Sequence, residues 1–387
     1  MEKFQPMRPS HDPWEAYLDQ EAYGGPALTN IEFTTTNLCN MRCEHCAVGY
    51  SLQQKEPDPL PLELFIKKLD EIPHLRALSI TGGEPMLNVS SVKNYVLPLL
   101  KYAHSRGART QINSNLTMPL KRYEWILPYL DVLHISHNYG SIEDFTDIGF
   151  AVMEKKPPKE VREKAFHRMV ENSRYLSRQG VMISAETMLN KRTLPNLASI
   201  HEQVLSMGCA RHEIHPMYPT SFAAHLETAG LDDVRGAIHK LLDIRDPDTW
   251  MLFGTLPFYA CSGDTRDLEL LSRLHEAPNV TVRNDPDGRS RLNVNIFDGG
   301  IHVTDFHQDG NLGTIHEQSL PEAFQSWQKT ETSRSLSCHC PEVKCLGPNL
   351  LVKNTYYPGH TFTSGSSKLS FHEKTAGRSV SSSSDFI

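Results

Sequence analysis

The sequence lacks the features of a membrane or secreted protein. No apolar run approaches the roughly 20 residues of a membrane-spanning helix, and residues 1–13 are polar and contain proline, which excludes a signal peptide or anchor there. An excess of basic residues is also missing, because 39 Lys and Arg stand against 46 Asp and Glu, for a net charge of −7. A protein with a net negative charge is poorly suited to bind nucleic acid. We therefore expect a cytoplasmic protein with no membrane or nucleic-acid partner.

Eight cysteines are present, and their grouping is informative. Without a secretion signal, cysteines are better explained as metal ligands or catalytic thiols than as disulfides. One group is Cys39, Cys43 and Cys46, and a second is Cys338, Cys340 and Cys345. Cys261 stands alone, and so does Cys209, which we interpret as a core thiol. The grouping predicts two metal centres.

The order of apolar segments predicts an α/β fold. With 387 residues and 39% hydrophobic content, the chain can form one large α/β domain and a smaller one. Strands are expected at 31–36, 77–81, 110–113, 132–136, 181–187 and 212–215. Helices are expected between them at 61–71, 89–105, 121–128, 158–179 and 194–207. Such alternation predicts a parallel sheet in a partial (β/α)6 TIM-type barrel, with its active site at the carboxyl ends of the strands.

After about residue 230 the pattern changes. We expect a helix at 231–243, a hairpin of 294–297 and 301–306 around an Asp-Gly-Gly turn, and a helix at 320–329. The end of the chain is rich in Ser, Thr and Gly and cannot bury enough apolar surface to fold. The predicted division is an N-terminal segment (1–28), the barrel (29–229), a C-terminal domain (230–357) and a disordered tail (358–387).

The first cysteine group lies in a short loop after the first expected strand. Three thiolates can hold three irons of a four-iron cluster and leave the fourth iron open for a ligand. The alternative is a zinc site with His45 as the fourth ligand. Ile80-Thr-Gly-Gly-Glu-Pro85 follows the second strand, and its two glycines let the backbone approach a ligand closely. The backbone carbonyl groups there can accept hydrogen bonds from an ammonium group of that ligand. Zinc ribbons lack such a turn after a β–α repeat, so the context favours iron and sulfur.

Together these two motifs resemble the radical S-adenosylmethionine (radical SAM) enzymes. The resemblance implies that Cys39, Cys43 and Cys46 hold a 4Fe–4S cluster, and that reductive cleavage of SAM there gives a 5′-deoxyadenosyl radical that abstracts hydrogen from a substrate. By the same match, the SAM contacts are Gly82, Gly83 and Glu84 for the amine, Ser114 and Asn115 for the ribose, Ser136 for the carboxylate, and His45 and Met217 for the adenine. Relatives commonly have Thr-Asn-Gly where this chain has Ser114-Asn-Leu, and an aromatic residue where it has His45.

Each of these contacts has an ordinary structural alternative. Serines at strand ends also act as caps, and a methionine also fills cores. Glu186, His215 and Tyr218 are expected at the same rim and are the candidates for the substrate side. For each of these three, a satisfied structural polar group is the alternative.

The second cysteine group, Cys338-His-Cys340-Pro-Glu-Val-Lys-Cys345, is similar to the C-terminal extensions that carry auxiliary clusters (SPASM or twitch domains). With the first loop, its spacing looks like that of the YfkAB family of radical SAM proteins. Cys261, an isolated cysteine in the same C-terminal region, is the simplest candidate for the fourth ligand of an auxiliary 4Fe–4S cluster. The alternatives are His302, His307 or His339, an open iron, or structural zinc.

The resemblance leaves the substrate open. It implies a peptide or protein side chain ahead of a small molecule, and an electron donor such as flavodoxin or ferredoxin. A non-catalytic zinc or iron–sulfur scaffold or redox sensor is the rival from another class, and it has no need of the Gly82-Gly83-Glu84 turn. An RNA-modifying radical enzyme would need a basic surface or an added RNA-binding module, which the sequence does not offer.

Overall fold

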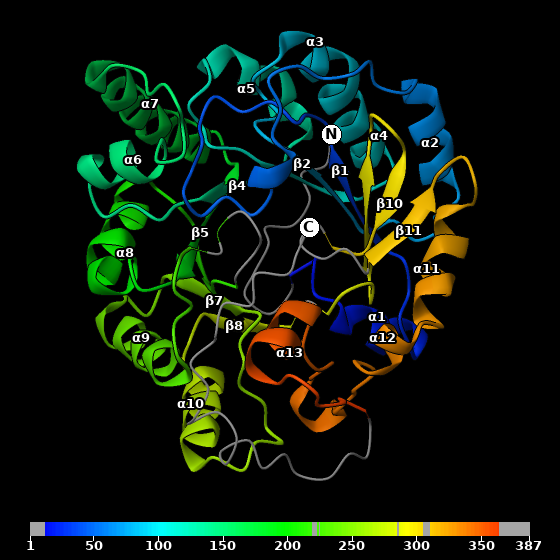
Figure 1. Cartoon of the computed structure of the whole chain (residues 1–387), viewed down its shortest axis with the longest axis vertical. Coiled ribbons are helices and arrows are strands. Elements are labelled where there is room, and N and C mark those ends of the chain that lie inside the picture. The colour runs from blue at the N-terminus through cyan, green and yellow to red at the C-terminus, as the bar shows by residue number, and fades with distance from the viewer. Residues whose placement is uncertain (1–11, 219–222, 224, 285, 305–309, 364–387) are drawn as a thin grey trace.

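The computed structural model describes residues 12–218, 223, 225–284, 286–304 and 310–363. Its strands form one sheet in the order β11-β10-β9-β1-β2-β3-β4-β5-β6-β7-β8 (Figure 1). The strands are β1 (Asn30–Thr34), β2 (Ala77–Thr81), β3 (Arg109–Asn113), β4 (Val132–Ser136), β5 (Met182–Leu189), β6 (Arg211–Pro216), β7 (Trp250–Gly254), β8 (Val280–Arg283), β9 (Arg291–Asn295), β10 (Gly300–His302) and β11 (Asn311–Thr314). Strands β1 to β8 run parallel in chain order, and β9 pairs in parallel with the other side of β1.

The helices are α1 (Tyr17–Tyr23), α2 (Leu62–Asp70), α3 (Val89–Ser91), α4 (Leu97–Ser105), α5 (Leu120–Ile126), α6 (Ile142–Ile148), α7 (Lys159–Arg178), α8 (Leu197–Ser206), α9 (Leu231–Ile244), α10 (Thr265–Glu276), α11 (Leu320–Gln328), α12 (Glu331–Arg334) and α13 (Leu350–Tyr356). Those from α2 to α10 lie between successive strands in the chain, and Figure 1 shows them around the outer side of the curved sheet, while α1 precedes β1 and α11 to α13 follow β11. A five-residue π-helical turn at Val92–Val96 joins α3 to α4. This confirms the predicted α/β architecture of a partial barrel, which stays open because β8 and β11 are the two edges of the sheet.

The sheet extends beyond the six predicted strands. Strands β7 and β8 continue it in parallel past residue 229, with α9 and α10 as the connecting helices. Neither strand was predicted from the sequence, and the five residues of β7 form a fully buried run that periodicity alone does not identify. The sheet therefore continues past the predicted domain boundary at 229/230. That boundary stays a prediction about where the C-terminal domain begins.

The expected hairpin near residue 298 is present. Strand β10 pairs antiparallel with β9 and also with β11. Gly299 has φ +70°, a left-handed conformation that a glycine adopts without strain. His307 and residues 364–387 of the predicted tail lie outside the described residues. Phe362, which the sequence analysis assigned to the tail, is 2% exposed and packs with Tyr259 and Tyr357.

The start of the described chain packs against the amino ends of the strands. Trp14 lies against Ala77, Val132 and Met182, at the first residues of β2, β4 and β5. Its indole Nε1 donates to Ser79 Oγ at 3.0 Å. This segment therefore closes the barrel at the end opposite to the expected active site.

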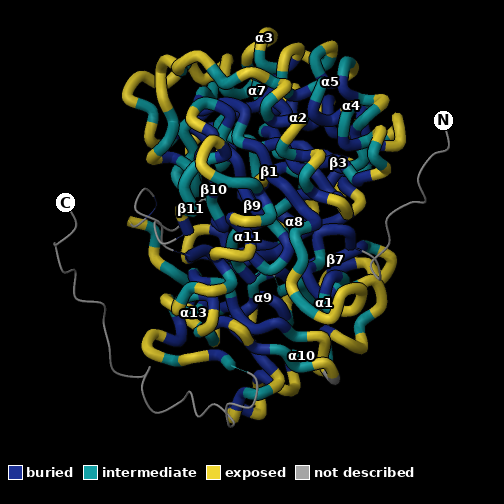
Figure 2. The backbone as a smooth tube through the Cα atoms, turned by 90° about the vertical axis from the view of Figure 1, so that its right-hand side faces the viewer, coloured by how far each residue is buried: buried dark blue, intermediate teal, exposed yellow. Residues whose placement is uncertain are grey.

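The main apolar core is formed by residues of the sheet and of its helices, and Figure 2 shows in dark blue where buried residues lie along the backbone. Phe33, Ile80, Leu133 and Ile183 are among its members and are 0% exposed. Alternate residues of the same strands face the barrel interior, where polar side chains such as Glu32, His134 and Glu213 lie. The core thus holds a rigid frame around a polar interior.

Candidate active site

A cavity of about 350 Å³ opens inside the barrel. Its lining includes all three cysteines of the first loop, together with Gly82, Gly83, Ser114, Asn115, Ser136, His45, Glu186, His215 and Tyr218. Residues predicted from the ends of six strands, β1 to β6, therefore surround one space. Met217 and Glu84 are the exceptions: they are 2% and 0% exposed and are not among the lining residues.

The cysteine loop is held by backbone contacts with the segment after α6. Arg42 N donates to Gly149 O at 3.1 Å, and Glu44 N donates to Ile148 O at 3.0 Å. The Arg42 guanidinium donates to the carbonyl oxygens of Cys39 and Met41, each at 2.9 Å, so this side chain braces the loop. The loop is thus fixed on the side away from the cavity.

The three thiols are in surroundings that suit a metal cluster. Burial raises the pKa of the Cys43 thiol to about 12 and also raises that of Cys46, so a thiolate there needs a bound cation. Donors lie near the sulfurs: Met41 N is 3.4 Å from Cys39 Sγ, and the Tyr139 hydroxyl is 3.7 Å from Cys43 Sγ. Such donors stabilise sulfur ligands of iron clusters. The residues present therefore fit a 4Fe–4S cluster.

The glycine turn is packed directly on the start of this loop. Gly83 N donates to Thr36 O and Glu84 N donates to Leu38 O, both at 2.7 Å. A Cβ atom on Gly82 would lie 2.2 Å from Thr36 O, and one on Gly83 would lie 2.2 Å from Leu38 O. Gly82 also has φ +138°, which side chains rarely adopt. These glycines are required because two backbones touch, in addition to any contact with a ligand.

Glu84 points away from the cavity. Its carboxylate is 0% exposed and accepts hydrogen bonds from Met86 N (2.9 Å), Asn115 N (2.7 Å) and Ser114 Oγ (2.9 Å). Burial raises its pKa to about 7, although these hydrogen bonds lower it. The side chain thus joins the ends of β2 and β3, and of the three predicted amine contacts only Gly82 and Gly83 line the cavity.

The other predicted SAM contacts have different surroundings. The Ser114 hydroxyl also contacts the Tyr123 hydroxyl at 2.9 Å, while the Asn115 amide donates to Asn40 Oδ1 at 2.9 Å. Ser136 is exposed to the cavity. His45 is 7% exposed, and its Nε2 contacts the Asn138 amide at 2.9 Å, so this nitrogen is occupied by a neighbour other than the cysteines.

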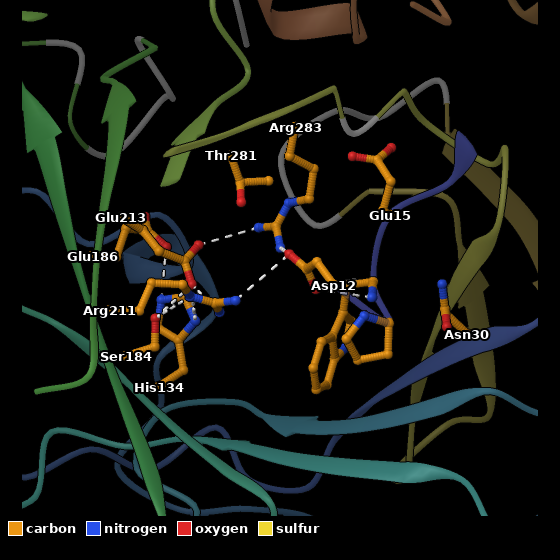
Figure 3. Close-up of polar contacts among 12 residues, drawn as sticks. Asp12, Glu15, Asn30, His134, Ser184, Glu186, Arg211, Glu213, Thr281 and Arg283 are labelled. Atoms are coloured by element: carbon orange, nitrogen blue, oxygen red, sulfur yellow. Dashed lines mark hydrogen bonds and ion pairs between the residues drawn. The ribbon is translucent and has the colours of Figure 1, made fainter. Parts of the chain in front are cut away.

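A buried charged network lies deeper in the barrel, and Figure 3 shows its members pointing toward one another. Glu213 is fully buried and pairs with Arg211 and with Arg283, the latter at 3.2 Å. Asp12 pairs with the same two arginines, at 3.5 Å and 2.7 Å. Burial alone would raise the pKa of Glu213, but the arginines and His134 hold it well below its usual range. The sequence analysis missed Asp12, Arg211 and Arg283.

Glu186 extends this network toward the cavity. Its Oε2 lies 2.9 Å from His134 Nε2, and the residue is the register partner of both Ser136 and Glu213. Burial would raise its pKa, but His215 and His134 lower it to about 2, so the carboxylate is ionised. The residue also lines the cavity. Glu186 thus offers an acceptor to a ligand in the cavity.

The second cysteine group packs on one side of an aromatic cluster beside this cavity. The cluster contains Tyr218, Tyr259, Tyr356, Tyr357 and Phe362, with Cys338 inside it and Cys261, Cys340 and Cys345 packed against it. The backbones of Cys340 and Cys345 form an antiparallel β-bridge, and both thiols are free. The sulfurs of Cys338 and Cys340 are 4.0 Å apart. The structure thus brings Cys261 to the other three, although 77 residues separate it from Cys338.

The histidines that were alternatives to Cys261 have other neighbours. His339 Nε2 lies 3.5 Å from the Tyr17 hydroxyl, and its ring contacts that of Tyr17. His302 lies on β10, in the hairpin with β9. Tyr218 lines the cavity and also belongs to the aromatic cluster, so the cluster borders the cavity.

Among the described residues, no helix is long and apolar enough to cross a membrane.

Comparisons with known proteins place this site in a family. Residues 33–189 match the radical SAM superfamily model, and residues 217–367 match the YfkB-like domain. The chain is 65% identical to the YfkA protein of Bacillus subtilis over 362 residues, which are 93% of this chain and 97% of that protein.

Two solved structures share the fold at low identity. Streptococcus suis SuiB bound to S-adenosylmethionine has a TM-score of 0.56 at 12% identity, over 90% of this chain and 79% of that one. The structure of anSMEcpe with bound AdoMet and the Cp18Cys peptide has a TM-score of 0.53 at 13% identity, over 79% of this chain and 81% of that one. The chain therefore belongs to the radical SAM superfamily of enzymes, which use S-adenosylmethionine and a 4Fe–4S cluster, and within it to the YfkAB family.

Proposed function

We propose that this enzyme cleaves S-adenosylmethionine reductively at a 4Fe–4S cluster held by Cys39, Cys43 and Cys46, and uses the product radical on a polar substrate. One observation carries the proposal: the start of the cysteine loop and the Gly82-Gly83-Glu84 turn are joined by two backbone hydrogen bonds of 2.7 Å, beside the cavity that Gly82, Gly83 and the three cysteines line. A scaffold protein has no need for that junction. When bound, the cluster supplies the electron that splits S-adenosylmethionine into methionine and a 5′-deoxyadenosyl radical.

The residues around the rim have distinct roles in this proposal. The backbone carbonyl groups of Gly82 and Gly83 accept hydrogen bonds from the ammonium group of S-adenosylmethionine. The Ser136 hydroxyl donates a hydrogen bond to its carboxylate. Asn115 faces the ribose, while His45 lies beside the adenine and Met217 packs behind it. Glu84 and Ser114 act as positioning residues, because their side chains bond to each other at 2.9 Å.

We propose a substrate with a hydrogen-bond donor near its reacting carbon. The ionised Glu186 carboxylate supports this, and His215 and Tyr218 also line the cavity. A peptide side chain is the favoured substrate, since SuiB and anSMEcpe, which share the fold, have been solved with the precursor peptide SuiA and with the Cp18Cys peptide. A small molecule is the second candidate. A flavodoxin or ferredoxin is the proposed electron donor.

The direct test is product formation by wild-type protein. Protein reconstituted with iron and sulfide under anaerobic conditions is mixed with dithionite and S-adenosylmethionine, and 5′-deoxyadenosine is measured by chromatography. We expect nucleoside release from the iron-loaded protein and none from a zinc-loaded sample. If the iron-loaded protein releases no more 5′-deoxyadenosine than the zinc-loaded protein, the non-catalytic scaffold is favoured.

We also propose that Cys261, Cys338, Cys340 and Cys345 hold an auxiliary 4Fe–4S cluster in the C-terminal part, 230–357. The sulfur of Cys345 accepts a hydrogen bond from Gly347 N at 3.3 Å, and the Asn284 amide lies 3.7 Å from it. Such contacts suit a thiolate ligand of iron. Structural zinc is the alternative for this site.

Replacing Cys261 with alanine should then remove iron from this second site alone. A complete auxiliary cluster contains four irons, so the variant should bind about four fewer irons than wild type. The matched control is Cys209→Ala, which removes a buried thiol that lies near Ser173, and its iron content should stay unchanged. Iron and zinc are counted by mass spectrometry. An unchanged iron content in Cys261→Ala would exclude this cysteine as a ligand.

A further inference from the structure

We infer that the Tyr139 hydroxyl donates a hydrogen bond to the Cys43 sulfur and thereby makes the first cluster easier to reduce. This inference rests on the proposed function, because it needs a cluster at Cys39, Cys43 and Cys46. Tyr139 is a positioning residue in this account: it acts through a cysteine ligand and need not contact the substrate.

The hydroxyl lies where such a bond forms. The Tyr139 oxygen is 3.7 Å from Cys43 Sγ, and this sulfur is its one hydrogen-bond partner within the described residues. A phenol keeps its proton at neutral pH, and an iron-bound thiolate carries negative charge, so the phenol is the donor and the sulfur the acceptor.

The ring of Tyr139 cannot easily turn the hydroxyl elsewhere. It is 2% exposed and packs edge-on against Phe145, with ring centroids 5.0 Å apart, and against His137 at 5.3 Å. Gly149 lies next to this ring, and a Cβ there would lie 2.5 Å from Met41 Cε and 2.8 Å from Phe145 O, so the segment is closely packed. The same Gly149 carbonyl binds the backbone of Arg42 in the cysteine loop. Ring and loop are therefore positioned by one segment.

The effect on the cluster follows from electrostatics. One electron from dithionite adds a negative charge to the cluster, and part of that charge resides on the ligand sulfurs. A fixed O–H dipole aimed at one sulfur stabilises the reduced form more than the oxidised form, and its effect is large where water is excluded. Loss of the hydroxyl should therefore make reduction less favourable.

The test is a potentiometric titration followed by electron paramagnetic resonance, on full-length Tyr139→Phe reconstituted with iron and sulfide. The first cluster is identified as the one whose spectrum changes when S-adenosylmethionine is added. We expect the equilibrium constant for its reduction to fall about tenfold, which is a shift of about 59 mV for one electron. The control is Tyr95→Phe, which loses a hydroxyl that donates to Leu60 O at 2.9 Å and should leave the potential unchanged.

A second measurement does not depend on the potential. Electron–nuclear double resonance of the reduced cluster should show a proton that exchanges in D2O and is missing from Tyr139→Phe. An unchanged potential together with an unchanged proton spectrum would overturn the inference. If no wild-type signal responds to S-adenosylmethionine, the proposed function itself fails, and the two failures are thus distinct.

Discussion

Gly83→Ala is expected to lower 5′-deoxyadenosine release by about 100-fold, the scale of loss when catalytic groups move by about 1 Å. The added Cβ would lie 2.2 Å from the Leu38 carbonyl oxygen and 2.5 Å from its carbon, and both atoms belong to backbone. Backbone cannot swing aside as a flexible side chain can. Either the turn or the start of the cysteine loop must shift, so the cluster and its ligand lose their relative placement.

The matched control is Gly236→Ala. Gly236 lies within α9, and a Cβ there meets nothing within 4 Å, so this alanine should leave release unchanged and can stabilise the helix by up to about 1 kcal/mol. Both variants are compared for iron content and for nucleoside release. Full activity in Gly83→Ala would show that the junction of turn and loop is not needed.

Glu213→Gln is expected to lower the free energy of unfolding by about 3 kcal/mol. Glu213 is the shared partner of two arginines, and neutralising it removes one of the two carboxylates that pair with both of their buried charges. The substitution keeps the shape of the side chain, so the loss is electrostatic rather than a cavity effect. Unfolding by urea, followed by circular dichroism, measures it.

Glu163→Gln serves as the comparison, since it breaks an exposed pair with Lys159 on α7. Exposed pairs contribute little, so this change should stay under about 0.5 kcal/mol. Similar losses for the two variants would contradict the assignment of Glu213 as the centre of a buried network.

Much of the site could be predicted because its parts are continuous in sequence. The cysteine loop and the Ile80–Pro85 turn are each short motifs at the ends of strands, and parallel strands bring their carboxyl ends to one rim. The direction of a side chain was not predictable in the same way. Glu84 was expected at the ligand, but its carboxylate turns inward to Ser114 and Asn115, which only the three-dimensional structure reveals.

The buried network was missed for a related reason. Asp12 and Arg283 are 271 residues apart, and a single charged residue in a sequence is ordinarily solvated. Neither residue carries a motif that signals a partner. Tyr139 was missed as well, because one tyrosine after a strand resembles any other until its hydroxyl is seen beside a cysteine sulfur.

The most direct test of the account compares wild type with a variant in which Cys39, Cys43 and Cys46 are all alanine. Both are reconstituted anaerobically, their iron is counted, and dithionite-dependent release of 5′-deoxyadenosine is measured. Iron that falls from about eight to about four atoms, with nucleoside release lost, is the predicted result. Release that persists in the variant, or an iron-loaded wild type that never cleaves S-adenosylmethionine, would contradict the central claim.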